Sequence, residues 1–168
     1  VSANNAGIVT VCSGGNGKDG EPRTDNIYPA DFDECVAVTA LNTDNTNCYW
    51  SDYNKKKNIS APGLLITTTD TTGGYSKASG TSMAAPIVSG VFALLFAAEP
   101  VATVDDACRA IYLTATPIQD LENDRTKTSG SKGVIDAEKA VHHLWGLGRT
   151  AFPDVSPGDW FFDAAYSM

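Results

Sequence analysis

The chain has 168 residues, of which 42% are hydrophobic and 19% charged, and its formal net charge is −8. This length suits one domain with a substantial core, and the composition excludes a chain that is disordered throughout. The acidic balance argues against nucleic acid as a partner, because proteins that bind it carry basic faces. We interpret the basic run at residues 55–57 as a solvated loop.

Short apolar runs rich in β-branched residues predict four strands, within residues 7–13, 34–40, 57–63 and 64–69. The first of these runs leads into a glycine-rich loop. Near-continuous apolar strands of this kind are typical of parallel sheets that helices cover. We therefore predict an α/β fold with three layers, α/β/α, and a largely parallel sheet.

Three helices are expected in the second half of the chain. The first covers about residues 82–99, and apolar residues surround it, so we expect it to be buried on all sides. Its apolar run is shorter than a membrane-spanning helix requires, and no membrane span is predicted. Thr103 is the expected N-cap of a second helix that ends near Leu113, and residues 136–145 are expected to form a third.

The four cysteines leave two interpretations open. Two disulfides would join them in one of three full pairings, or they are small buried thiols. Their spacing lacks any Cys-x-x-Cys pair, which argues against a zinc site. The residues are Cys12, Cys35, Cys48 and Cys108.

The segment KASGTSMAAP, residues 77–86, places Ser82 where a helix begins. A serine at such a position is commonly a helix cap. Two features favour a reactive serine instead. Pro86 has no N–H to donate to the Ser82 carbonyl, and Gly80 and Thr81 allow a sharp turn into the helix. The free N–H groups of the first turn would then stabilise negative charge beside the serine, although the pattern is not the Gly-x-Ser-x-Gly of a nucleophile elbow.

The run SGTSMAAPIVSGVFALL closely resembles the catalytic-serine motif of the subtilisin-like serine peptidases, the subtilases. The resemblance implies that residues 1–148 are the C-terminal portion of a subtilase catalytic domain, a partial subtilisin-like fold. It also implies a serine endopeptidase that acts through an acyl-enzyme. Further segments resemble the family in chain order, and these are GIVTVCSGGNGKDG, IYPADFDECVAVTA, ISAPG and GVIDAEKAV.

The matched motifs imply which residues carry the chemistry. Ser82 is the implied nucleophile and Asn16 the implied oxyanion donor, although an asparagine in a glycine-rich loop is more often a turn residue. An acyl-transfer transition state gathers negative charge on the former carbonyl oxygen, and a neutral amide opposite the Ser82 N–H can hold it. The residues implied to form the substrate-binding site are Ser13, Gly14, Gly15, Ile27, Gly80 and Thr81.

Ile27 falls where the family places the base of the pocket for the substrate residue before the cleaved bond. Many members have glycine there, and a β-branched side chain makes the pocket shallower. We therefore predict a preference for small substrate side chains. The adjoining Tyr28-Pro29 resembles a family position where the peptide bond is commonly cis.

A serine nucleophile needs a base, and the base needs an orienting carboxylate. The family order is Asp, His, Ser, yet no histidine precedes Ser82 in this sequence. His142 and His143 lie in the last predicted helix, where we expect surface or packing roles. We expect the catalytic Asp and His upstream of Val1, so that the chain alone does not hydrolyse peptides. The alternative is a non-catalytic subtilase-like domain that binds a cell wall or a partner.

The composition changes after Gly148, and FPDVSPGDWFFDAAYSM resembles the opening of a surface-layer homology (SLH) repeat. We interpret residues 149–168 as a linker and the beginning of a truncated repeat, with an ordinary exposed tail as the alternative. SLH modules bind bacterial cell-wall polymers. The resemblance thus implies an extracellular, cell-wall-associated protein with a polypeptide substrate and a cell-wall polymer as partners.

The implied chemistry needs no cofactor, but subtilases often bind structural calcium. The loop at residues 25–34 offers hard oxygen ligands of the kind that calcium prefers. Their spacing fits no calcium-loop pattern, so a solvated acidic turn is the alternative. The residues are Asp25, Asp31, Asp33 and Glu34.

Overall fold

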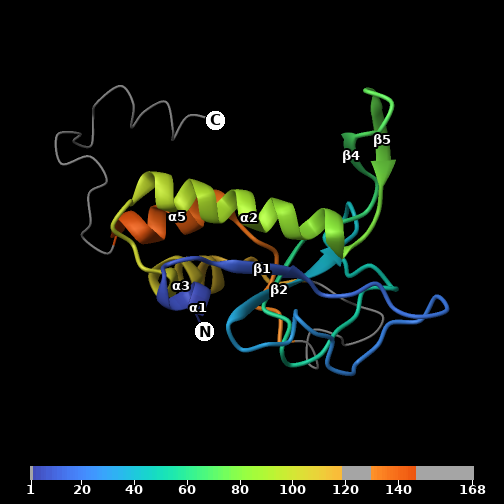
Figure 1. Ribbon diagram of the computed structural model, residues 1–168, viewed down its shortest axis with the longest axis horizontal. Coiled ribbons are helices and arrows are strands. Elements are labelled where there is room, and N and C mark those ends of the chain that lie inside the picture. The colour runs from blue at the N-terminus through green and yellow to red at the C-terminus, as the bar shows by residue number, and fades with distance from the viewer. Residues whose placement is uncertain (1, 119–129, 147–168) are drawn as a thin grey trace.

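The computed structural model describes residues 2–118 and 130–146. Its central sheet is parallel, with the strand order β1–β2–β3 (Figure 1). The register places Thr10 beside Cys35 and Val38 beside Ile59. The predicted α/β class with a parallel sheet is confirmed. The three strands are β1 (Thr10–Ser13), β2 (Cys35–Leu41) and β3 (Ile59–Pro62).

The predicted helices form close to their expected bounds. Thr103 caps α3, because its hydroxyl accepts a hydrogen bond from the Asp106 N–H while the Asp106 carboxylate accepts one from the Thr103 N–H. Asp136 directly precedes α5, and its carboxylate accepts a hydrogen bond from the Lys139 N–H at 2.9 Å. The helices of the described residues are α1 (Ser2–Asn5), α2 (Thr81–Ala98), α3 (Val104–Thr114) and α5 (Ala137–Gly146).

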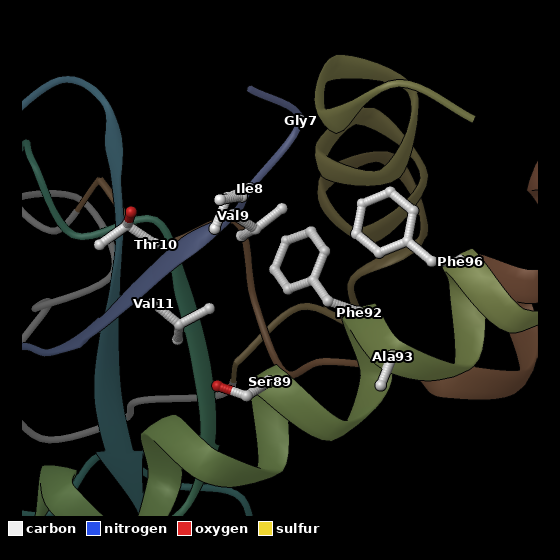
Figure 2. Close-up of a pocket in the computed structure, with 9 residues that line it drawn as sticks. All are labelled: Gly7, Ile8, Val9, Thr10, Val11, Ser89, Phe92, Ala93 and Phe96. Atoms are coloured by element: carbon white, nitrogen blue, oxygen red, sulfur yellow. The ribbon is translucent and has the colours of Figure 1, made fainter. Parts of the chain in front are cut away.

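Helices pack against the central sheet. Side chains around β1 alternate between the two faces. Val11 points toward α2 and lines a groove with Phe92 (Figure 2). A second hollow near the start of β1 is lined by Thr10 together with Ala3 of α1. On the α2 side, α3 and α5 pack against each other and both contact α2. The parallel sheet with helices packed against it is consistent with a partial α/β/α domain.

Residues 64–69 were predicted to contain a strand, and they form β4 (Ile66–Thr69). This strand does not join the parallel sheet. It pairs antiparallel with β5 (Tyr75–Ala78), which the sequence analysis did not predict because its side chains are mostly exposed and follow no apolar pattern. The hairpin projects away from the sheet and leads directly into α2 (Figure 1).

Helix α2 was expected to be buried on all sides, and this expectation is wrong for the described chain. The sheet, α3 and α5 cover one side of it, so Val88 and Leu95 are fully buried whereas Leu94 is 55% exposed. By length and composition alone α2 is apolar enough to cross a membrane. Its buried residues instead belong to the domain interior, and they are Thr81, Ala84, Val88, Val91, Phe92 and Leu95.

The four cysteines are free thiols in this structure. Burial raises the pKa of Cys48 and of Cys108 to about 11, so both remain protonated at neutral pH. Of the two interpretations, the structure agrees with thiols and not with disulfides. The predicted linker and repeat, residues 149–168, lie outside the described residues.

Candidate functional site

Ser82 is the second residue of α2, and it is exposed where the helix opens toward solvent. The N-cap position belongs to Gly80, which has a φ of 156° and provides no capping side chain. Ser82 is therefore not the helix cap. The Gly80 N–H donates to the Gly63 carbonyl at 2.8 Å, which ties the turn before the helix to the end of β3. The helix continues through Pro86.

Thr81 fixes the orientation of the Asn16 side-chain amide. The Thr81 N–H and hydroxyl each donate to Asn16 Oδ1, both at 2.8 Å. The same hydroxyl accepts a hydrogen bond from the Gly15 N–H at 3.1 Å. Because Thr81 engages the carbonyl end of the amide, the Nδ2 donors of Asn16 are left for another acceptor. The sequence analysis placed Thr81 at the site but did not foresee this clamp.

Gly80 keeps the space between two donors open. A Cβ at this position would lie 3.3 Å from Asn16 Nδ2 and 3.6 Å from the backbone nitrogen of Ser82. Both N–H groups therefore flank the same small volume, which any side chain at Gly80 would occupy. The N-terminus of α2 adds a positive dipole at this point. The arrangement is suited to an oxygen atom that carries negative charge.

Two glycines bring the loop after β1 close to its neighbours. A Cβ at Gly14 would lie 2.7 Å from the carbonyl oxygen of Val38 in β2. Gly15 has a φ of 107°, and a Cβ there would lie 2.1 Å from Asp52 Oδ2 and 2.8 Å from Ile27 Cδ1. Ile27 thus packs directly behind the Gly15 backbone.

The residues that the sequence analysis assigned to the site lie together. They gather where β1 ends and α2 begins, at the carboxyl edge of the parallel sheet, which is where α/β proteins place their ligands. Ile27 reaches this group from the following loop through its contact with Gly15. The assembled residues are Ser13, Gly14, Gly15, Asn16, Ile27, Gly80, Thr81 and Ser82.

A buried carboxylate that the sequence analysis missed lies behind this loop. Asp52 is fully buried, and it accepts hydrogen bonds from the Arg23 N–H at 2.6 Å and from Arg23 Nη2 at 3.1 Å. Its own N–H donates to the Gly15 carbonyl at 3.0 Å. Asp52 therefore connects the loop around Arg23 to Gly15, in the loop that follows β1. No motif distinguishes it, because the contact depends on the folded chain.

A fully buried ion pair corrects the interpretation of the basic run. Lys57 was expected in a solvated loop, but its side chain is fully buried and its ammonium contacts Asp31 Oδ1 at 2.6 Å. The neighbouring Lys55 and Lys56 are exposed, as expected. Burial alone would raise the pKa of the Asp31 carboxyl, but hydrogen bonds from Lys57, Ile27 and Asn54 hold that pKa below its ordinary value.

Two aspartates of the loop that was considered for calcium form ion pairs with these lysines. Asp31 pairs with Lys57, and Asp33 pairs with Lys56. Within residues 2–118 and 130–146, no group of three or more His, Cys, Asp or Glu side chains is placed to hold a metal ion. Calcium binding stays a prediction, which calorimetric titration with Ca²⁺ would test.

Two smaller expectations concern the flanks of the site. The Tyr28–Pro29 peptide bond is cis, as predicted. In α5, the His142 ring stacks on Trp145 with a centroid distance of 6.1 Å. This contact agrees with the packing role that was expected for His142.

Comparison with known proteins supports the resemblance seen in the motifs. The Subtilase family (Peptidase S8) matches residues 1–148. Subtilisin DY of Bacillus licheniformis is 31% identical over 137 residues, which are 81% of this chain and 47% of that protein. The major intracellular serine protease of Bacillus subtilis is 41% identical over 90 residues, which are 53% of this chain and 28% of that protein.

The fold has a solved counterpart as well. The structure of the prenylagaramide maturation protease PagA aligns with a TM-score of 0.75 at 26% identity, over 86% of this chain and 53% of that one. The chain spans less than half the length of the two curated relatives above. The match over most of the chain and the shared subtilisin-like fold lead to one conclusion: the chain belongs to the subtilase family of serine peptidases.

Proposed function

We propose that this chain is the nucleophile-bearing part of a subtilisin-like serine endopeptidase, with Ser82 as the nucleophile and Asn16 as the oxyanion donor. The observation that carries the proposal is the fixed Asn16 amide. Thr81 holds its carbonyl end, so Nδ2 flanks the space beside the Ser82 N–H. Donors that are fixed before the reaction stabilise the developing charge without reorganising.

The proposed reaction proceeds in two steps. Ser82 Oγ attacks the peptide carbonyl carbon and gives its proton to a base, and the carbonyl electrons move to an oxygen held by Asn16 Nδ2 and the Ser82 N–H. Collapse of this intermediate breaks the C–N bond, and the amine leaves with the proton from the base. Water then attacks the resulting ester by the same route and releases the second product and the free serine.

The base and its orienting carboxylate are proposed to lie upstream of Val1. The chain covers less than half of the relatives described above, and no histidine precedes Ser82 in it. A triad that lacks members retains only the residual catalysis that the oxyanion site and substrate binding supply. We therefore expect the isolated chain to be nearly inactive and the longer gene product to be active.

The substrate of this enzyme is proposed to be a polypeptide with a small side chain before the cleaved bond. The loop from Ser13 to Gly15 forms one wall of the pocket, and the Ile27 side chain forms its base against Gly15. A series of peptides that differ only at that residue tests this. We expect alanine to be preferred to phenylalanine in the parent enzyme and the preference to weaken in Ile27→Gly. Faster cleavage after phenylalanine in the parent would contradict it.

A separate proposal, from the sequence alone, is that residues 149–168 begin a module that attaches the protein to a bacterial cell wall. The relatives include a protein named as an intracellular protease, so location needs its own test. The test compares the binding of the gene product to purified cell walls with that of a variant in which residues 149–168 are deleted. Equal binding by the two proteins would refute the attachment role.

The decisive test of the enzyme assignment is labelling of the full-length gene product with a fluorophosphonate probe. We expect labelling that Ser82→Ala abolishes and that Ser89→Ala, on the same helix, leaves intact. Persistent labelling of folded Ser82→Ala would refute the nucleophile assignment. A folded parent protein that is not labelled would favour the non-catalytic, wall-binding or partner-binding alternative.

A further inference from the structure

The ion pair between Asp31 and Lys57 is shielded from water. Both side chains have 0% exposure, and Lys57 Nζ lies 2.6 Å from Asp31 Oδ1. Apolar residues of similar volume are often at least as stabilising as a buried ion pair, so its presence calls for a role other than stability. The neighbouring ion pair between Lys56 and Asp33 is exposed, so its charges stay hydrated and lose little solvation on folding.

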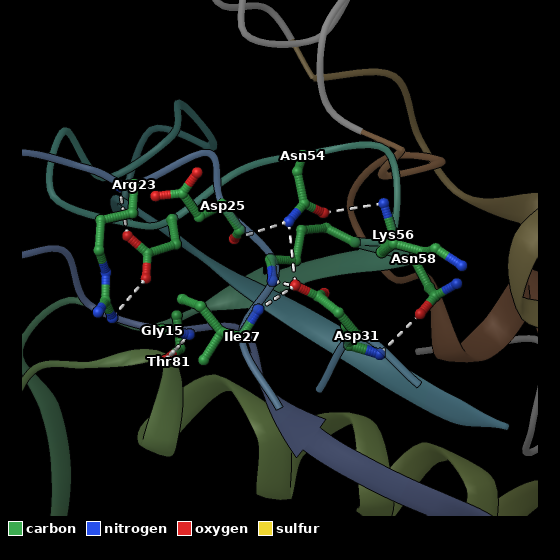
Figure 3. Close-up of polar contacts among 12 residues, drawn as sticks. Gly15, Arg23, Asp25, Ile27, Asp31, Asn54, Lys56, Asn58 and Thr81 are labelled. Atoms are coloured by element: carbon green, nitrogen blue, oxygen red, sulfur yellow. Dashed lines mark hydrogen bonds and ion pairs between the residues drawn. The ribbon is translucent and has the colours of Figure 1, made fainter. Parts of the chain in front are cut away.

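Asp31 holds the Ile27 backbone at both of its polar groups. Asp31 Oδ2 accepts a hydrogen bond from the Ile27 N–H at 2.7 Å, and the Asp31 N–H donates to the Ile27 carbonyl at 2.9 Å. The same Oδ2 accepts a second hydrogen bond, from Asn54 Nδ2 at 3.0 Å (Figure 3). The carboxylate therefore fixes both the position and the orientation of Ile27.

Lys57 connects this clamp to the opposite part of the pocket. Its Cδ atom would be 3.5 Å from a Cβ placed on Gly14, so the aliphatic stem runs behind the glycine wall. Its ammonium ends on Asp31, which holds Ile27. One buried side chain thus links the wall and the base, the two parts whose separation sets the depth of the pocket.

We propose that Asp31 and Lys57 are positioning residues that set the depth of the substrate side-chain pocket by fixing Ile27 relative to Gly14. This inference rests on the proposed function, because it takes Ile27 as the base of the pocket. Neither residue touches the substrate in this role. The Asp31 carboxyl keeps a lowered pKa, so the clamp stays ionised at neutral pH.

The test uses the full-length gene product and two adjacent lysines. Lys57→Met keeps an unbranched stem behind Gly14 but removes the ammonium that anchors Asp31. Lys56→Met is the matched control on the exposed neighbour. The readout is the ratio of kcat/KM for two peptides that carry alanine or phenylalanine before the cleaved bond. A purely structural loss lowers both values together and leaves this ratio unchanged.

We expect Lys57→Met to move the ratio toward phenylalanine by about tenfold. This is the low end of the change in kcat/KM discrimination that one methylene group in an apolar pocket produces. Ile27→Gly should move it further in the same direction, and Lys56→Met should not move it. Because Lys57→Met leaves a buried carboxylate unpaired and can unfold the protein, Asn54→Ala is the second variant. It removes one hydrogen bond from Asp31 Oδ2 and leaves no charge unpaired.

For Asn54→Ala we expect a smaller shift in the same direction, about two- to threefold, as for one weakened hydrogen bond. An unchanged ratio in Asn54→Ala, or in folded Lys57→Met, overturns the positioning role while fluorophosphonate labelling of Ser82 leaves the enzyme assignment standing. A parent protein that is folded but not labelled at Ser82 overturns the enzyme assignment, and the positioning role falls with it.

Discussion

Two regions of the molecule meet at Thr81, and different interactions hold them together. From Thr81 onward, α2 joins the sheet, α3 and α5 through apolar side chains such as Val88 and Leu95. Before Thr81, the loops around Asn16 are joined by directed polar contacts to buried charged residues such as Asp52. Apolar packing tolerates substitutions of similar volume, whereas a hydrogen bond requires a particular donor and acceptor.

This contrast suggests that the two regions make different contributions to the protein. The apolar region supplies most of the free energy of folding, because burial of apolar surface is the dominant favourable contribution. The polar region positions the proposed site, because each of its contacts fixes one group of the oxyanion site or of the pocket. Substitutions in the first region should therefore alter stability, and substitutions in the second should alter rate or specificity.

The largest effect is expected from Leu95→Ala in the apolar region. Leu95 is fully buried, so the substitution should lower the free energy of unfolding by about 2–5 kcal/mol through lost burial and the cavity that remains. Leu94→Ala is the matched control, because Leu94 is 55% exposed and should change stability by about 0.5 kcal/mol or less. Urea unfolding measures both, and similar losses in the two variants would contradict the one-sided burial of α2.

Asn16→Ala should affect the reaction rate more than the stability of the fold. We expect kcat of the full-length enzyme to fall about 10²–10³-fold, the range already known for removal of an oxyanion-hole asparagine in a subtilisin. Asn16 is exposed but accepts two hydrogen bonds from the buried Thr81, so the melting temperature should also fall, by less than in Leu95→Ala. Steady-state kinetics with a chromogenic peptide and a thermal melt make the comparison. A variant that retains full kcat would remove Asn16 from the reaction.

Thr81 tests whether the clamp matters separately from the donor. Thr81→Val removes the hydroxyl that donates to Asn16 and accepts from Gly15, and Thr81→Ser keeps it. With each hydrogen bond worth about 1 kcal/mol, Thr81→Val should lower kcat/KM by about tenfold, and Thr81→Ser should stay near the parent value. Equal losses in the two variants would point to packing of the threonine methyl group instead.

The smallest effect concerns acid stability. The folded pKa of Asp31 lies below its unfolded value, which is about 3.9 for an aspartate, so Asp31 stabilises the fold above that pH. The stabilisation should be lost as the pH falls through the folded pKa. In Lys57→Met the pKa is less depressed, so urea unfolding between pH 3 and 6 should show a shallower acid loss than in the parent. Parallel curves would contradict the assigned cause.

The same contrast explains what the sequence could predict. The helices were placed well because their signals are local: the Thr103 cap with Asp106, and the apolar run of α2. Ser82 and Asn16 were found because they stand in motifs of continuous sequence. The exposed side of α2 was missed, because an apolar helix has the same pattern whether one or all of its sides are covered.

The two ion pairs that involve a buried carboxylate were missed for a related reason. Lys57 and Asp31 are 26 residues apart, and Asp52 and Arg23 are 29 apart, so no local pattern marks either pair. Lys57 also follows two exposed lysines in the same run. Only the folded backbone shows that one of the three side chains turns inward. Sequence motifs therefore pointed to the proposed reacting groups, and the structure was needed to find the contacts that hold them.

The measurement that bears most directly on the proposed oxyanion site is a crystal structure of the full-length protein after reaction with a fluorophosphonate. We predict a covalent bond from Ser82 Oγ to phosphorus, with a phosphonyl oxygen within hydrogen-bond distance of both Asn16 Nδ2 and the Ser82 backbone nitrogen. An adduct on another residue, or a phosphonyl oxygen that points away from Asn16, would contradict the proposed site.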